Sequence, residues 1–206
     1  MAISLKVESK GEANAGTITT TCPECGHQAS LLQLGADIHI GNQFICGQRL
    51  CPNPKCKRHL FIASLRGELI FQYPPLRIPF EKENIPGQIL ETFEEALTCH
   101  SESCYVAAAI MVRRTLEEIC EERGAPGGDL KERIKNLKTK IVLPHELLEA
   151  MDELRLLGND AAHIEAKSYS QIGKEELETA IDLTKEILKA LYQYSTLLSK
   201  IRALKK

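Results

Sequence analysis

The sequence predicts an α+β protein in which a small N-terminal β region precedes a bundle of four or five helices. Three observations lead to this fold class. Five of the eight cysteines lie between residues 22 and 56, among short apolar segments interrupted by glycine and proline. Residues 73–86 contain four prolines, which disfavour regular structure. After Pro86 the apolar residues recur every three or four positions, as on the buried face of a helix.

The length of 206 residues is enough for two domains with a buried core. The formal net charge is −2, so overall charge does not point to a nucleic-acid or membrane partner, and any basic surface must be local. The N-terminus contains no apolar segment of signal-peptide length, and no apolar run is long enough to span a bilayer. We therefore expect a cytoplasmic protein without a membrane partner. In such a protein, cysteines indicate metal ligands or free thiols rather than disulfides.

We expect four parts along the chain. Residues 1–16 form a polar, flexible N-terminus, residues 17–72 a small cysteine-rich β domain, residues 73–86 a proline-rich linker and residues 87–206 a helical domain. The β domain begins at TITTT and continues through ASLLQL, FICGQRL, HLFIASLRG and ELIFQYPP. In this last pair of segments, Arg66-Gly67-Glu68 is suited to a hairpin turn.

The helical domain is expected to contain helices at residues 87–100, about 101–124, 129–140, 144–166 and from about 173 to the end. Pro86 and Pro144 suit the first turn of a helix. Asp129 is a favourable N-cap, and Gly124 is typical of a helix end. The last helix carries one continuous apolar stripe, as expected for a bundle helix that packs on its neighbours.

Two cysteine motifs in the β domain indicate a metal site. The cysteine pairs of CPECG and CPNPKC are separated by 25 residues, which leaves room for the hairpins of a zinc ribbon. Zn²⁺ prefers four tetrahedral ligands, and a site closed by four thiolates is structural. We therefore predict a structural zinc ion, which would supply much of the folding free energy of so small a domain. The predicted ligands are Cys22, Cys25, Cys51 and Cys56.

Other interpretations of the cysteines remain open. Cys46, His27 and His59 compete as ligands, and Cys46 could replace Cys51. The cluster could also consist of free thiols without a metal. The remaining cysteines lie in the helical domain and are interpreted as small buried apolar residues; these are Cys99, Cys104 and Cys120.

The expected ribbon also carries a mild basic patch, because KCKRH lies beside the second cysteine motif. Such a patch contacts nucleic acid or is simply a solvated surface. The aromatic residues available for stacking there are Phe44, Phe61 and Phe71. The basic residues are Arg49, Lys55, Lys57, Arg58 and Arg66, against the acidic residues Glu24, Asp37 and Glu68.

The stretch LRLLGNDAAH (154–163) places three polar residues four positions apart, so a continuous helix would carry them on one face. They are Arg155, Asn159 and His163. Imidazole can act as a general acid or base near neutral pH, so these residues are the candidate catalytic group. Alternatively, Asn159 and His163 satisfy each other at a helix crossing, where Gly158 permits close packing.

The helical half resembles the HEPN superfamily (higher eukaryotes and prokaryotes nucleotide-binding). Over about residues 20 to 195 the chain is more specifically similar to the family called domain of unknown function DUF4145. The resemblance rests on YPP and IP before the first helix, on AAAIMVRRTLEEICEERG and on LRLLGNDAAH, with the cysteine ribbon ahead of them.

The HEPN resemblance implies metal-independent RNA cleavage by a homodimer that forms through the helical domain. In the active signature, histidine moves protons and arginine steadies the phosphate; His163 and Asn159 match this signature, whereas its arginine position falls on Gly158. Arg155 lies one turn earlier and would have to reach His163 of the other subunit. Arg113 and Arg114 offer other cations, although such a pair is typically one buried, ion-paired arginine and one exposed arginine.

Three functions follow from the residues and the resemblance together. The chain is a metal-independent endoribonuclease in prokaryotic defence, a module that binds RNA or nucleotide without cleavage, or a catalytically inactive dimerisation adaptor. The resemblance implies that RNA and other defence proteins are its partners.

Overall fold

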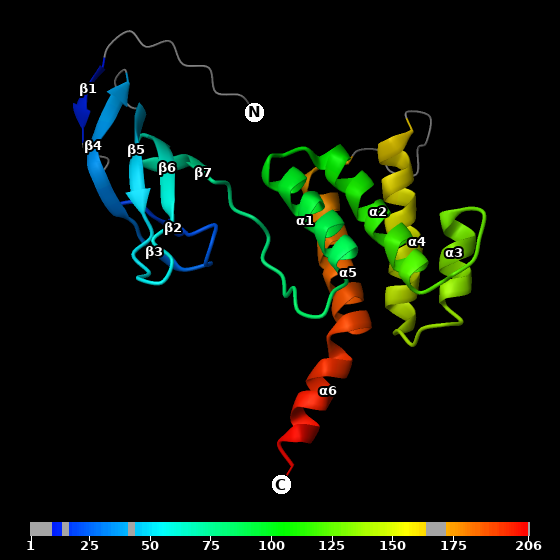
Figure 1. The fold of residues 1–206 in the computed structure, drawn as a ribbon. Coiled ribbons are helices and arrows are strands. Elements are labelled where there is room, and N and C mark those ends of the chain that lie inside the picture. Colours follow the sequence, from blue (N-terminus) through cyan, green and yellow to red (C-terminus); the bar gives the residue numbers. More distant parts are fainter. Residues whose placement is uncertain (1–9, 14–16, 41–43, 164–171, 206) are drawn as a thin grey trace. The chain divides into compact units, whose positions relative to one another are not determined.

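The computed structural model describes residues 10–13, 17–40, 44–163 and 172–205. The chain divides into two compact units, Met1–Arg77 and Ile78–Lys206 (Figure 1). The first unit consists of β-strands and the second of helices, so the α+β fold class is confirmed. The division falls inside residues 73–86, the segment expected as a linker. In the part of the chain that is described, no helix is both long enough and apolar enough to cross a membrane.

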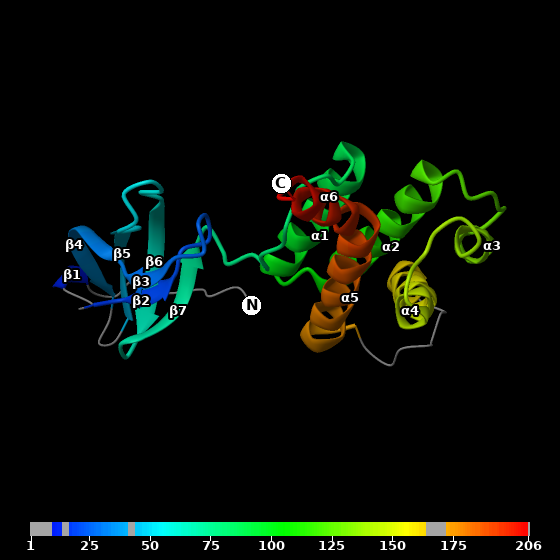
Figure 2. The same ribbon diagram turned by 90° about the horizontal axis from the view of Figure 1, so that it is seen from below.

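The first unit is built on an antiparallel sheet with the strand order β1-β4-β5-β6-β7, beside a separate hairpin formed by β2 and β3 (Figure 2). Residues 10–13, which were expected in the flexible N-terminus, instead form β1 and pair with β4. The strands are β1 (Lys10–Ala13), β2 (Thr19–Thr21), β3 (Gln28–Ser30), β4 (Leu32–Ile40), β5 (Phe44–Leu50), β6 (His59–Leu65) and β7 (Glu68–Tyr73).

The hairpin between β6 and β7 turns where the sequence predicts. β6 ends at Leu65 and β7 begins at Glu68, so two residues form the loop. Arg66 and Gly67 both have positive φ, 54° and 85°. Two consecutive residues with positive φ define the type I′ turn, whose twist matches that of the flanking strands.

A buried ion pair joins β4 to β5. The Arg49 guanidinium contacts the Asp37 carboxylate through two bonds, Nη1 to Oδ1 at 2.6 Å and Nη2 to Oδ2 at 2.9 Å. A register shift in β4 between Leu34 and Ile38 lies next to Asp37, and both charged residues are almost completely buried. Arg49 therefore does not belong to the basic surface in which the sequence analysis placed it.

The sheet has two unlike faces, as alternation along a strand requires. On one face Leu60 packs with Leu31, Cys22 and Cys51 in a small core. This core holds few large apolar side chains. On the opposite face the large apolar side chains of β4, β6 and β7 are exposed.

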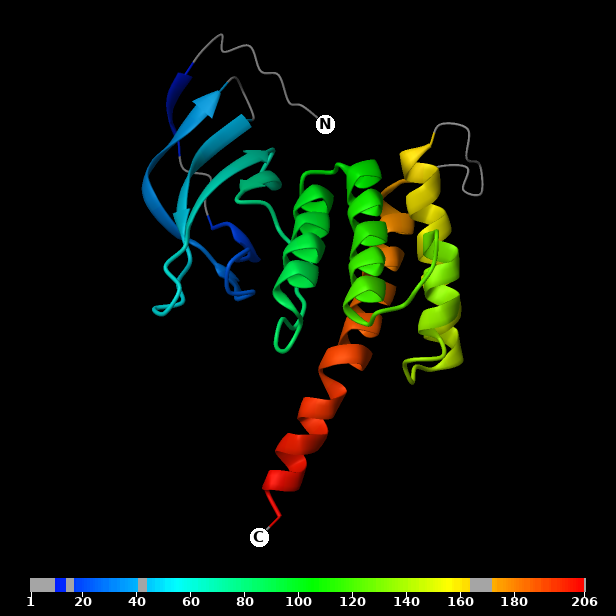
Figure 3. The same ribbon diagram turned by 45° about the vertical axis from the view of Figure 1, so that its right-hand side comes forward.

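The second unit contains six helices within its described residues, and α2 lies at its centre. Figures 1 and 3 show α2 flanked by α1 and α4. Its central residues, including Val112, Leu116 and Ile119, are completely buried. The helices are α1 (Gly87–Ser101), α2 (Tyr105–Glu122), α3 (Leu130–Leu137), α4 (His145–Ala162), α5 (Lys174–Tyr192) and α6 (Tyr194–Ala203).

The segment before α1 belongs to the helical core rather than to a free linker. Ile85 is buried, and the Phe80 ring packs edge to face on Phe93 with 4.9 Å between centroids. Apolar residues among the prolines therefore anchor this segment to the bundle.

Several predicted helix ends are confirmed. The Asp129 side chain accepts the N–H of Glu132 at 2.8 Å and caps α3. Gly124 follows α2 with a φ of +61°, a conformation in which glycine meets no steric penalty. Pro144 directly precedes α4.

Three expected helices end earlier than the sequence predicts, among them α3, which was expected to reach residue 140 and ends at Leu137. The last expected helix is interrupted at Gln193, which separates α5 from α6 with a φ of −109°. Gln193 is buried, and its Nε2 donates to the Glu81 carbonyl at 2.8 Å, so a tertiary contact accompanies the break. α4 ends at Ala162, whereas the pattern predicted a helix to residue 166; residues 164–166 lie outside the described part of the chain.

The three helical cysteines differ in their exposure. Cys120 is buried as expected, Cys99 is half-buried and Cys104 is exposed. Cys104 lies directly before α2, outside the helix in which a buried face was expected. The expectation of a buried residue is therefore wrong for Cys104.

Candidate functional site

The first cysteine pair lies in the turn between β2 and β3. The main-chain N–H of Cys22 donates to the carbonyl of His27, and the N–H of Gly26 donates to the carbonyl of Cys22, both at 3.0 Å. Gly26 has a φ of +68°, which glycine adopts without the steric cost that a Cβ imposes. The glycine of CPECG therefore allows a tight loop around Cys22 and Cys25.

The second pair is built in the same way between β5 and β6. The N–H of Cys51 donates to the carbonyl of Arg58 at 2.9 Å, and the N–H groups of Cys56 and Lys57 donate to the carbonyl of Asn53, both at 3.0 Å. Lys57 has a φ of +48° and thus occupies the position that Gly26 holds in the first loop. In both loops the first cysteine bonds to the residue two positions after the second cysteine.

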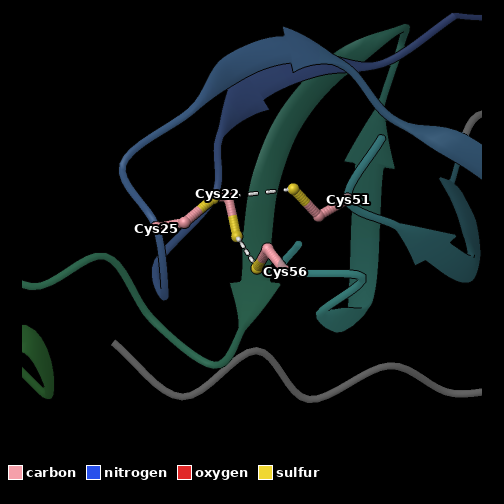
Figure 4. Close-up of side chains that lie close together, drawn as sticks. All are labelled: Cys22, Cys25, Cys51 and Cys56. Carbon is pink, nitrogen blue, oxygen red and sulfur yellow. Dashed lines mark hydrogen bonds between the residues drawn. The ribbon is translucent and has the colours of Figure 1, made fainter. Parts of the chain in front are cut away.

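The two loops bring four sulfur atoms together (Figure 4). The Sγ atoms of Cys22, Cys25, Cys51 and Cys56 all lie within 4.8 Å of one another. Cys22 Sγ is 3.8 Å from Cys56 Sγ, and Cys25 Sγ is 3.7 Å from Cys51 Sγ. A tetrahedral ion with metal–sulfur bonds of about 2.3 Å separates its sulfur ligands by roughly 3.8 Å. The spacing of the cluster is therefore compatible with a bound metal ion.

The pKa values of the cysteines in this cluster shift in opposite directions. The main-chain N–H of His27 lowers the pKa of Cys25 to about 7. Burial raises the pKa of Cys51 to about 12, and the N–H of Asn53 opposes this effect. Asn53 also donates from Nδ2 to Cys25 Sγ at 3.7 Å, while its Oδ1 accepts the N–H of Lys55 at 3.0 Å. Asn53 was not among the site residues predicted from the sequence, although an asparagine between two prolines is typical of such a turn.

The competing ligands lie outside the cluster. Cys46 pairs with Ile38 and Ala63 in the middle of the sheet. The Nε2 of His59 is 3.1 Å from the Gln48 Oε1, and His27 participates through its main chain. Within the described residues, the four cysteines predicted as ligands are therefore brought together without these three.

The predicted polar stripe in the helical unit is only partly on a helix. Arg155 and Asn159 lie in α4, but His163 has left it, with φ −129° and ψ 120°. The N–H of His163 still donates to the carbonyl of Asn159 at 3.1 Å. The expectation that three residues share one helical face is therefore wrong for His163, which is an exposed residue at the end of α4.

The Arg155 side chain takes part in a charge network between α3 and α4. Its Nε lies 3.6 Å from Asp152 Oδ1, and its side chain is 17% exposed. Asp152 Oδ2 also accepts from Lys138 Nζ at 3.1 Å. This network holds the Arg155 guanidinium beside an acidic partner of its own subunit.

Arg113 reaches α4 from the neighbouring helix, a contact that the sequence analysis did not predict. Its Nη1 donates to the carbonyl of Arg155 at 3.3 Å, and its Nε donates to Glu117 at 3.1 Å. The Arg113 side chain is 24% exposed, whereas that of Arg114, paired with Glu118, is 62% exposed. Arg114 is therefore exposed as expected, whereas Arg113 is half-buried rather than buried. The feature of the sequence that could have indicated this contact is the small residue Gly158, which allows α2 to approach α4 closely.

The comparisons with known proteins identify the helical unit. The sequence model of the family described as domain of unknown function (DUF4145) matches residues 94–205. No match was found among curated proteins or among solved structures. The matched segment includes α2, α4 and the residues of the polar stripe, and it extends over more than half of the chain. The protein therefore belongs to the DUF4145 family.

Proposed function

We propose that the four cysteines bind one Zn²⁺ as a structural centre of the first unit. The observation that carries this proposal is the sulfur spacing of 3.7 and 3.8 Å between the two loops. Four thiolates leave no coordination position for water or substrate, so the ion would crosslink the β2–β3 and β5–β6 loops without a catalytic role. The small core around Leu31 and Leu60 makes such a crosslink important for folding.

For the helical unit we propose an RNA-directed, HEPN-like function, with His163 as the group that moves protons. The observation that supports it is the exposed position of His163, directly after the helix that carries Asn159 and Arg155. Attack of a ribose 2′-hydroxyl on the adjacent phosphorus forms a 2′,3′-cyclic phosphate and releases a 5′-hydroxyl. A histidine accelerates this reaction when it accepts the first proton or supplies the last one.

The proposed ribonuclease requires a cation for the phosphate, and Gly158 cannot supply it. Arg155 of a second subunit is the candidate, as the HEPN resemblance implies. Figures 1 and 3 show α2 and α4 antiparallel, so the end of α4 lies beside the first part of α2. There, Val106 and Ile110 are exposed apolar residues one turn apart. This surface supports a homodimer that would bring two copies of the His163 region together.

Incubation of a single-stranded RNA with the purified protein in excess EDTA tests the activity. We expect cleavage that leaves 5′-hydroxyl ends, and we expect His163→Ala to abolish it. The matched control is His145→Ala, because His145 is an exposed histidine at the other end of the same helix. Equal loss in both variants, or cleavage that survives His163→Ala, contradicts the assignment. Val106→Glu should separate the subunits in sedimentation and abolish cleavage with them.

One observation favours a second function, a catalytically inactive adaptor. The Arg155 guanidinium is already paired with Asp152 of its own subunit, and a glycine occupies the arginine position of the HEPN signature. For an adaptor, Arg155→Ala would weaken self-association and RNA would remain intact under every condition. The two functions are therefore separated by one cleavage assay and one sedimentation measurement on the same variants.

A further inference from the structure

Two aromatic side chains lie next to each other on the exposed face of the sheet in the first unit. Phe61 on β6 is the direct cross-strand partner of Tyr73 on β7. Phe61 is 45% exposed and Tyr73 is 58% exposed. Directly opposed residues in an antiparallel pair project from the same face. Phe71, two residues before Tyr73, is also exposed and extends the aromatic surface along β7.

A pocket of about 470 Å³ adjoins this aromatic pair. Its size is in the range of small-ligand sites, so it can hold a nucleobase with its sugar. His59 and Gln48 line the pocket and contact each other at 3.1 Å. An amide and an imidazole at this position offer hydrogen-bond donors and acceptors to the edge of a base.

Two cations line the same pocket. Lys57 and Arg58 follow the last cysteine of the second loop, and the left-handed φ of Lys57 belongs to the turn that presents them. Arg58 lies 3.7 Å from the carboxylate of Glu24, and both side chains are about half exposed. Exposed ion pairs of this length are weak, so Arg58 remains available to another anion. Asp37 does not oppose these cations, because it is buried against Arg49.

The chemistry of this end of the sheet differs from that of the other. On β4 the exposed side chains of the same face are aliphatic, among them Leu32 and Ile38. Around the pocket, aromatic rings, cations and hydrogen-bonding groups occur together. An aliphatic protein partner needs neither the cations nor the hydrogen-bonding groups. Single-stranded nucleic acid uses all three kinds of group: bases stack on the aromatic rings, phosphates contact the cations and base edges form hydrogen bonds.

We propose that this pocket binds single-stranded nucleic acid, with a base stacked against Phe61 and Tyr73 and the adjoining phosphates on Lys57 and Arg58. The site is separate from the His163 region and does not depend on cleavage there. RNA and DNA share the chemistry that the pocket recognises, namely flat bases and phosphates.

Fluorescence anisotropy with labelled oligodeoxythymidine of about ten nucleotides tests the proposal on the full-length, zinc-loaded protein. This probe lacks the 2′-hydroxyl that the proposed cleavage requires, so failure of the ribonuclease assignment cannot produce failure here. Oligouridine of the same length distinguishes RNA from DNA, and a duplex of that length tests the preference for single strands. We expect binding of both single strands and clearly weaker binding of the duplex.

Phe61→Leu and Tyr73→Leu retain apolar surface but remove the ring, and we expect each to weaken binding about tenfold. The matched control is Ile38→Ala, an exposed apolar residue of the same face that does not line the pocket; it should bind as the wild type does. Each variant must retain its zinc content, which shows that the ribbon is folded. Wild-type affinity in both ring variants overturns the proposal.

Removal of the positive charges of Lys57 and Arg58 provides an independent test of the phosphate contacts. Lys57→Asn keeps a residue that tolerates positive φ, and Arg58→Gln keeps side-chain length. Each should reduce the salt dependence of binding by about one released counterion. An unchanged salt dependence in both variants overturns the phosphate contacts. The face would belong to a second copy of the chain if the wild type bound no oligonucleotide and Phe61→Leu lost self-association. That result overturns the proposal as well.

Discussion

Arg113 on α2 occupies the space that a side chain at position 158 of α4 would need. A Cβ added to Gly158 would lie 2.4 Å from the Cβ of Arg113 and 3.1 Å from the carbonyl oxygen of Ala109. The helix backbones therefore approach so closely here that only glycine fits. The interpretation of Gly158 as a packing contact is confirmed. The same contact leaves no room for an arginine side chain at position 158.

Gly158→Ala should destabilise the helical unit. Alanine is the better helix former by about 1 kcal/mol, but overpacking at the α2–α4 contact costs about 1–3 kcal/mol, so we expect a net loss or at best no gain. Urea unfolding followed by far-UV circular dichroism measures the change in unfolding free energy. The control is Gly87→Ala, because a Cβ at Gly87 meets no atom within 4 Å. If Gly158→Ala is more stable than Gly87→Ala, the close contact is not maintained in solution.

Asp37→Ala should destabilise the ribbon by about 3–5 kcal/mol, since it leaves the Arg49 charge buried without its partner. Asp37→Ala combined with Arg49→Met removes both charges and should recover a large part of the loss. Thermal release of zinc to a coloured chelator reports the stability of this unit. Arg58→Gln, which breaks only the exposed pair with Glu24, should stay within about 1 kcal/mol of the wild type. A double variant as unstable as Asp37→Ala contradicts this explanation.

Features that depend on local chemistry could be predicted from the sequence. The turn at Arg66-Gly67 and the cap at Asp129 each depend on residues within one turn. The grouping of the four cysteines was also predictable, because metal-binding loops have a characteristic spacing. In the turn, in the cap and within each cysteine loop, the residues that determine the structure are neighbours in the sequence.

Features that depend on tertiary contacts could not be predicted. The helical periodicity continues through Gln193, yet its buried side chain bonds to Glu81, far away in the sequence. Arg49 has the sequence environment of a surface residue, but β4 brings Asp37 against it. Similarly, Tyr73 lies next to two prolines and was assigned to the linker region, although strand pairing places it beside Phe61. Pairing register and long-range hydrogen bonds determine all three.

The stabilising effect of Cys120 should disappear at high pH. Burial raises the pKa of its thiol to about 11, whereas the thiol of an unfolded chain titrates near about 8.5. Below the lower value both states are protonated and the contribution is complete. Above it the unfolded state ionises first, so the free energy of unfolding falls by roughly 3 kcal/mol as pH rises through the folded value. Cys120→Ala lacks this thiol, so the difference in unfolding free energy between wild type and variant should shrink between roughly pH 8.5 and 11. A difference that is constant with pH contradicts burial of the thiol.

Cys22→Ser should remove the metal, and Cys46→Ser should not. Cys22 Sγ lies 3.8 Å from Cys56 Sγ inside the cluster, whereas Cys46 lies in the sheet and pairs with Ala63. We expect about one zinc per chain in the wild type and in Cys46→Ser, and far less in Cys22→Ser. Metal analysis of the purified proteins measures the zinc content. Circular dichroism of Cys22→Ser should show loss of β-structure with the helices retained, because the helical unit has its own core. Equal zinc in both variants would exclude Cys22 as a ligand, and loss of zinc only in Cys46→Ser would assign the ion to a different set of cysteines.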